Sequence, residues 1–199
     1  MAVTTYAELS TLKDSVRVDD EEDDLQLQKA LNGASRAIDR VTGRRFWLDD
    51  AVSARTYRPE GRTALMRAGE HLLLVDDIGT TAGLIVETGS ASTSWTVVTS
   101  YETEPENALV DGRPITGILH LTGSWPSGRG QRVRVTATWG WPAVPDDIEQ
   151  ACLILARRLF HRKDSPAGVM GSQEWVVNLA RRDPDVQGLI EHFVIPGFG

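Results

Sequence analysis

Four histidines are the first candidates for metal binding or proton transfer, because an imidazole titrates near neutrality and is a common metal ligand. They are His71, His120, His161 and His192, and each falls in a different predicted element. None has a second histidine, a cysteine or a carboxylate at metal-ligand spacing on the same predicted face. The pattern therefore predicts no metal site, no catalytic base and no cofactor.

The single cysteine, Cys152, cannot form a disulfide within the chain. It lies in an apolar helical pattern, which predicts a small buried side chain rather than a reactive thiol. The sequence has no phosphate loop, no Gly-x-Ser-x-Gly elbow and no His-Glu-x-x-His motif. It therefore predicts a protein that is not an enzyme. A small hydrolase built on scattered acids is the alternative, and it requires a cleft with a strongly perturbed carboxylate or histidine.

Six consecutive carboxylates form an acidic run that deserves the same test for cation binding. The alternating acids, central glycine and distal glutamate of a calcium-binding EF-hand loop are missing from it. The run comes directly before an amphipathic helical stripe, where the helix dipole favours negative charge. We interpret it as a solvated helix start. Its members are Asp19, Asp20, Glu21, Glu22, Asp23 and Asp24.

The charge balance limits the partners that the chain can take. The formal net charge is −7, from 28 acidic and 21 basic residues. This argues against wrapping nucleic acid, because neutralising phosphates takes Lys and Arg. A nucleic-acid-binding accessory protein remains an alternative, because three tryptophans between 125 and 141 lie near arginines. No apolar run approaches the roughly 20 residues that cross a bilayer, so no membrane partner is expected. The polar N-terminus predicts a soluble chain without a signal peptide.

Helical patterns occupy both ends of the chain. Thr5 and Glu8 have the spacing of a capping box before a short helix. A long helix follows with one apolar stripe and Gly43 as its C-cap. A second long helix begins at Pro145. Asp183-Pro184 opens a short helix that runs through Phe193 and ends at Pro196. The two apolar stripes are Leu27, Leu31, Ala34, Ile38 and Val41 in the first long helix, and Ile148, Cys152, Leu155 and Leu159 in the second.

The middle of the chain alternates with the period of strands. Runs at 71–75, 84–88, 95–99, 115–121 and 132–139 predict an antiparallel meander or small barrel. Turn signals separate them, among them Asp76-Asp77 before Gly79, and Glu87-Thr88-Gly89. The clearest strand points Val133, Val135, Ala137 and Trp139 one way and Arg132, Arg134, Thr136 and Thr138 the other.

These patterns predict an α+β fold. Its helical core consists of two long helices plus short helices, from residues 1–50 and 143–199, and residues 51–142 form an inserted antiparallel β-lobe. The apolar C-terminal segment must bury itself on its own domain or on a partner. Both interpretations stay open for Phe193, Val194, Ile195 and Phe198, the candidate partner-binding residues.

Three stretches also carry a likeness to a known family. The first joins residues 6–24, with their acidic run, to residues 34–46, which contain Thr42-Gly43-Arg44. The second is Val133-Arg134-Val135 followed by Trp139-Gly140-Trp141 and Val144-Pro145, and the third is residues 181–190. In this order, over about half the chain, they resemble the head–tail connector (adaptor, or head-completion) family of long-tailed bacteriophages, especially members from phages and prophages of actinobacteria.

The resemblance implies a structural virion protein without catalytic or cofactor residues. It implies a ring, commonly of twelve copies, beneath the portal protein of the capsid, with the stopper or tail-completion protein on its other face. The C-terminal segment would reach toward the portal, and the helices would surround the genomic DNA, with residues 19–24 as candidates for lining the channel. The expected location is the head–tail interface of the virion, after assembly in the host cytoplasm.

Overall fold

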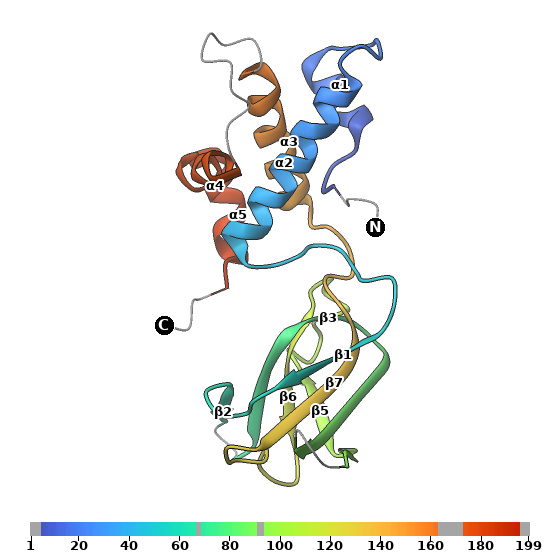
Figure 1. The fold of residues 1–199 in the computed structure, drawn as a ribbon, viewed down its shortest axis with the longest axis vertical. Coiled ribbons are helices and arrows are strands. Elements are labelled where there is room, and N and C mark those ends of the chain that lie inside the picture. The colour runs from blue at the N-terminus through green and yellow to red at the C-terminus, as the bar shows by residue number, and fades with distance from the viewer. Residues whose placement is uncertain (1–4, 67–68, 91–93, 163–172, 196–199) are drawn as a thin grey trace. The chain divides into compact units, whose positions relative to one another are not determined.

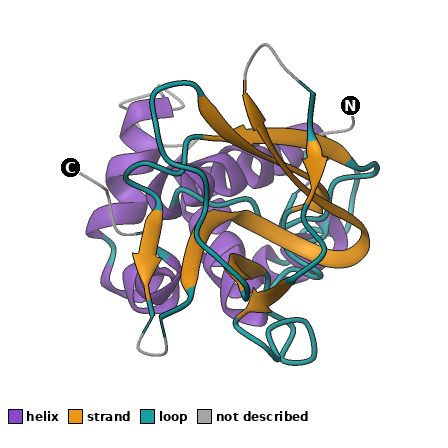
Figure 2. Ribbon diagram, turned by 90° about the horizontal axis from the view of Figure 1, so that it is seen from below, coloured by secondary structure: helices purple, strands orange, loops and turns teal. Residues whose placement is uncertain are grey.

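The computed structural model describes residues 5–66, 69–90, 94–162 and 173–195. Its contacts divide the chain into two compact units (Figure 1). Residues 1–46 and 144–199 form the helical unit, and residues 47–143 form the β unit. Figure 2 shows the helices and strands coloured by type. The predicted α+β class is confirmed.

The helical unit is organised around α2 (Asp24–Thr42), which packs against α3 (Asp146–His161). The predicted stripe of α2 is buried as far as Ile38, whereas Val41 at its end is only half-buried. Gly43 ends the helix in the left-handed region, at a φ of 72°, and its N–H donates to the carbonyl of Asp39 at 2.8 Å. The predicted glycine C-cap is therefore confirmed.

The first helix differs from its prediction. α1 (Leu9–Val16) begins after Glu8, which is its N-cap and makes no side-chain capping bond. The capping box predicted between Thr5 and Glu8 is therefore wrong. A neighbouring hydrogen bond gives the physical reason. The N–H of Tyr6 donates to Ser35 Oγ on α2 at 3.1 Å, which holds the residues before Glu8 outside the helix.

The C-terminal half of the helical unit contains one element that the sequence patterns did not predict. α3 begins one residue later than predicted, because Pro145 is its extended N-cap rather than its first helical residue. The helix buries Ile148, Cys152 and Leu155 of the predicted stripe, whereas Leu159 is half-buried. The unpredicted element is α4 (Gln173–Arg182), where Val176 and Ala180 lie one helical turn apart and are both buried. The predicted short helix is present as α5 (Pro184–Ile190), extended by a 3-10 turn (Glu191–Phe193).

The β unit is one antiparallel sheet with the strand order β1-β7-β3-β6-β5, and β2 and β4 each pair with β3. The predicted strands at 115–121 and 132–139 are β6 and β7, and only two residues of the predicted run at 95–99 form β4. The strands are β1 (Ser53–Tyr57), β2 (Thr63–Leu65), β3 (His71–Ser90), β4 (Thr96–Val97), β5 (Tyr101–Glu104), β6 (Ile115–His120) and β7 (Gln131–Trp139).

β3 corrects two of the predicted turns, because the runs at 71–75 and 84–88 are halves of one 20-residue strand. Asp76-Asp77 and Glu87-Thr88-Gly89 lie within this strand. Register shifts between Leu74 and Ile78, and on either side of Thr80, replace the turn. They let the first half pair with β6 and β2 and the second half with β7 and β4. The Asp76-Asp77 pair marks a bend in a continuous strand.

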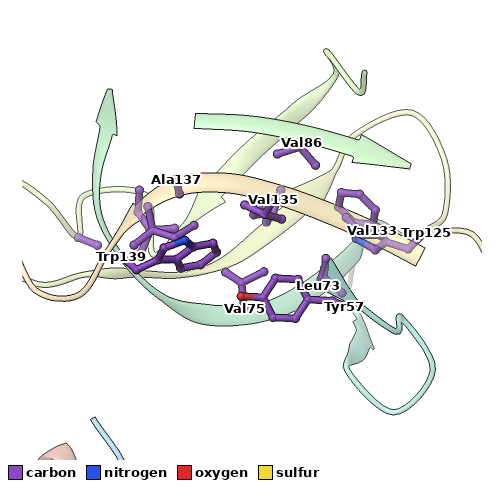
Figure 3. Packing of buried hydrophobic residues seen from close by; sticks show 13 residues of the cluster. Tyr57, Leu73, Val75, Val86, Trp125, Val133, Val135, Ala137 and Trp139 are labelled. Atoms are coloured by element: carbon purple, nitrogen blue, oxygen red, sulfur yellow. The ribbon is translucent and has the colours of Figure 1, made fainter. Parts of the chain in front are cut away.

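The core of the β unit lies on the inner face of β7 (Figure 3). Val133, Val135, Ala137 and Trp139 are all buried, so the predicted alternation of β7 is confirmed. The indole N–H of Trp139 donates to the carbonyl of Ser53 at 2.8 Å, which satisfies its polar edge inside the core. Residues from β1, β3, β6 and the Trp125 segment complete the cluster.

Candidate assembly surfaces

The four histidines lie in four different elements, as predicted, but the sheet brings two of them together. His71 and His120 are direct neighbours across the β3–β6 pairing, although they lie in separate predicted elements. The His120 ring packs edge-on against Trp125, with 5.0 Å between centroids, and the indole N–H of Trp125 donates to the carbonyl of His71. Within the described ranges, no cluster of three or more His, Cys, Asp or Glu side chains is arranged to hold a metal ion.

Cys152 is fully buried in the helical unit, as the sequence predicts. Its Sγ lies 3.4 Å from Ser35 Oγ. Burial raises the pKa of the thiol to about 11, so the group is protonated and unreactive at neutral pH. Cys152 therefore acts as a small packing residue between α3 and α2.

The acidic run occupies the turn between α1 and α2. Four of its residues (19–22), which we call the acidic turn, are exposed, and no salt bridge of theirs is found among the described residues. Asp24, the first residue of α2, instead pairs with the Lys13 ammonium at 2.5 Å. This hydrogen bond is the main cause that raises the pKa of Lys13. The turn therefore presents exposed negative charge, which Lys13 offsets only in part, close in sequence to the exposed Leu25.

The C-terminal segment returns to the end of α2. Phe193 is buried, and its ring packs edge-on against Phe46 with 5.3 Å between centroids. Its carbonyl accepts from Arg44 Nε at 2.7 Å, and the N–H of Ile195 donates to the carbonyl of Thr42 at 2.9 Å. Val194 and Ile195 keep 40% of their side chains exposed, and Phe198 lies outside the described residues. The path of the segment is thus fixed by its own unit up to Ile195, and partner binding by this segment stays a prediction.

A buried polar network that the sequence does not indicate lies near the C-terminal end of α2. The phenol of Tyr6 donates to the Asp39 carboxylate and accepts from the N–H of Phe46 at 3.1 Å. Arg36 approaches Asp39 at 3.1 Å. Burial raises the pKa of the Asp39 carboxyl, and burial together with the Asp39 charge raises the pKa of Tyr6. The network joins the N-terminal segment to α2, and no local motif indicates it.

The cationic end of α3 is partly used inside the helical unit. The Arg158 guanidinium contacts the buried Asp183 carboxylate and pairs with Asp185 at 2.7 Å. Asp183 also caps α5, by accepting from the N–H groups of Asp185 and Val186. Arg157 and His161 remain exposed on the last two turns. The helix end is therefore partly a structural contact with α5.

The outward side of β1, β7, the second half of β3, and β4 forms a surface that we call the outer face. The strand registers show which residues are neighbours across this face. At its centre Glu87 lies between Arg134 on β7 and Val97 on β4. The Arg134 guanidinium makes two 2.7 Å hydrogen bonds with Glu87 and lies 4.4 Å from the centroid of Trp95. The members of the outer face are Ala54, Thr56, Ile85, Glu87, Trp95, Val97, Arg132, Arg134 and Thr136.

Two solved structures resemble the whole chain. A chain described as the neck of an empty GTA (gene transfer agent) particle, computed with C6 symmetry, covers 100% of this chain over 95% of its own, with 22% identity and a TM-score of 0.59. This chain has the fold of a GTA neck protein. The neck of the native GTA particle, computed with C12 symmetry, gives the same coverages, 21% identity and a TM-score of 0.56. No protein-family model and no curated protein matches the sequence.

The likeness to GTA neck proteins extends further than the likeness seen in the sequence. The sequence motifs lie at both ends and in the last strand, whereas the shared fold includes the whole β unit. It agrees with the resemblance to head–tail connectors drawn from those motifs. The described residues also contain no helix long and apolar enough to span a membrane.

Proposed function

We propose that this chain is a structural neck protein that acts as a head-to-tail adaptor. Copies of it would form a ring, of twelve subunits in the simplest case, between the portal of a capsid and the stopper or tail proteins. The observation that carries the proposal is the full-length match to chains from GTA particle necks, which were computed with C6 and C12 symmetry. The sequence motifs that resemble head–tail connectors support it independently.

The charge of the chain suits a ring around DNA. Each copy carries a formal charge of −7, so a ring multiplies a negative field that discourages phosphates from adhering to its bore. The acidic turn and Asp23 and Asp24 are candidates for facing this channel. DNA would then pass close to the protein without specific contacts.

The C-terminal segment is the proposed contact with the portal protein. Phe193 is buried in the helical unit. Within the described part of the C-terminal segment, Val194 and Ile195 are therefore the exposed apolar residues. An apolar surface of this kind is stabilised when a partner covers it. The adaptor would be made in the host cytoplasm and retained in the virion at the head–tail interface.

Electron microscopy and mass spectrometry of purified particles test this proposal. We expect the chain in every tailed particle, as a symmetric ring at the neck, and expect it to co-purify with the portal protein. A particle that lacks the chain would refute the adaptor role. A shift of labelled DNA by the free chain at low ionic strength would instead favour an accessory nucleic-acid-binding protein.

Matched variants test the portal contact. Ile195→Asp places a charge on the exposed part of the C-terminal segment, and Val110→Asp does the same at a residue of the β unit that is 88% exposed. We expect Ile195→Asp to reduce co-purification with the portal and Val110→Asp to leave it unchanged. Equal retention of both variants would refute the contact at this segment.

A further inference from the structure

The outer face of the β unit has the composition of a protein contact. Its centre holds a tryptophan and an arginine stacked together, residue types that dominate binding energy at interfaces. Ile85 and Val97 flank this centre, and their side chains are 45% and 56% exposed. The face therefore combines an aromatic–arginine anchor with uncovered aliphatic surface.

The same face is cationic, although the β unit as a whole is acidic. Arg134 is balanced by Glu87, but Arg132 donates to the backbone carbonyls of Arg129 and Gln131 rather than to a carboxylate. Arg58 directly follows β1 and extends the outer face, because strand alternation places it on the side of Ala54 and Thr56. It is exposed and has no ion pair among the described residues. These two arginines leave uncompensated positive charge beside the exposed aliphatic side chains.

A complementary surface exists on the same chain, in the other unit. The acidic turn exposes four carboxylates that make no salt bridge within the part of the chain that the structure describes. Leu25, close to the turn in sequence, is 65% exposed. The acidic turn thus complements the outer face in charge, and each surface also has an exposed apolar residue to bury against the other. Electrostatic complementarity of this kind selects and orients a partner.

A ring needs two different surfaces on each subunit, because its contacts run head to tail. We propose that the outer face of one copy binds the acidic turn of a neighbouring copy. The proposal rests on the ring assembly proposed above and names the surfaces that close it. In this pairing the acidic turn lies at the boundary between two copies, so of residues 19–24 only Asp23 and Asp24 stay candidates for facing the channel. Arg58 and Arg132 contact the carboxylates of the acidic turn, while Ile85 and Val97 cover the neighbour's Leu25.

A charge exchange tests this pairing in the assembled particle. The face variant is Arg58→Glu with Arg132→Glu, and the turn variant is Glu21→Arg with Glu22→Arg. Each variant alone should lower incorporation into particles by about tenfold, because it sets like charges against each other. The chain with all four substitutions should recover to within about threefold of the unmodified chain, because the attraction is restored with the signs exchanged.

A matched control separates this contact from a general effect of charge. Arg113→Glu with Arg157→Glu changes the net charge by the same amount as the face variant and lies outside the outer face. It should assemble normally. If the face and turn variants also assemble normally, the pairing is refuted while the adaptor role stands. If the unmodified chain is absent from particles, the adaptor role itself fails.

A binding titration tests the contact without assembly. A synthetic peptide of residues 17–26 is added to the isotope-labelled full chain, and amide signals are followed by NMR. We expect saturable shifts at Ile85, Val97 and Arg132 that vanish when the peptide acids are replaced by their amides. No shift at millimolar peptide, or larger shifts at the same amides with a DNA oligonucleotide, would overturn the proposal.

Discussion

Phe193 gives the sharpest test of how the C-terminal segment is held. Its side chain is 9% exposed and packs edge-on against Phe46 in the helical unit. Replacing a core phenylalanine by alanine costs about 3–5 kcal/mol, because transfer energy and a cavity term add. This site is next to a chain end that can relax, so we expect Phe193→Ala to lower the free energy of unfolding by about 2–4 kcal/mol.

The paired variant is Ile195→Ser, two residues later. The exposed side chain of Ile195 makes a smaller contribution to the fold, so we expect a loss below about 1 kcal/mol. Urea unfolding followed by circular dichroism at constant protein concentration measures both variants. The loss for Phe193→Ala belongs to the helical unit, so its helical signal should shift. Tryptophan fluorescence should move less, because five of the six tryptophans belong to the β unit.

The reasoning fails if the two variants behave alike. If Phe193→Ala lowered the free energy of unfolding by less than about 0.5 kcal/mol, the C-terminal segment would not stay packed against Phe46 in the free protein. The segment would then be held mainly by a partner, and Phe193 would join Val194 and Ile195 as a contact residue. A large loss for Ile195→Ser would show that the backbone bond from Ile195 to Thr42 depends on that side chain.

Three further perturbations follow from described contacts. Burial raises the pKa of Asp39, so the folded state holds its proton to higher pH than the unfolded state, and stability falls as pH rises from about 4 through the folded pKa. Asp39→Asn, which still accepts from Tyr6, should flatten that decline in urea titrations between pH 4 and 7; an unchanged slope would contradict the assignment. With a thiol pKa of about 11, Cys152 should react with iodoacetamide at pH 8 at least about a hundredfold more slowly in the folded chain than in urea. Gly140→Ala places a Cβ in contact with the Trp47 carbonyl at a φ of 111°, so calorimetry should show a loss of at least about 3 kcal/mol, whereas a normal melting temperature would show that the loop relaxes.

The elements that the sequence predicts well are those with a strong apolar period. The stripe of α2 and the alternation of β7 are both visible in the residues. The stripe is buried as far as Ile38, and the inward residues of β7 are all buried. The sequence does not predict the edge strand β1, because only Tyr57 among its five residues is buried. Its residues therefore show almost no alternation of apolar and polar side chains. The bend in β3 resembled a turn because paired aspartates usually end a strand, whereas here Asp76 receives a hydrogen bond from the Tyr57 hydroxyl.

The candidate surfaces were only partly visible in the sequence. The acidic turn was located before its helix, and the outward direction of Arg132 and Arg134 follows from alternation. Their partners could not be predicted, because Glu87 lies 47 residues from Arg134 in the chain and meets it only through the sheet register. The same holds for Tyr6 and Asp39, which are 33 residues apart.

The division of the chain sets an order on its folding during synthesis. The β unit is one continuous stretch, residues 47–143, whereas the helical unit takes its residues from both ends. All of the β unit therefore leaves the ribosome before α3 does, and α2 must wait for its packing partner until translation is nearly complete. Until then the apolar stripe of α2 is uncovered, so nascent chains are most vulnerable to proteases and to premature association in that interval.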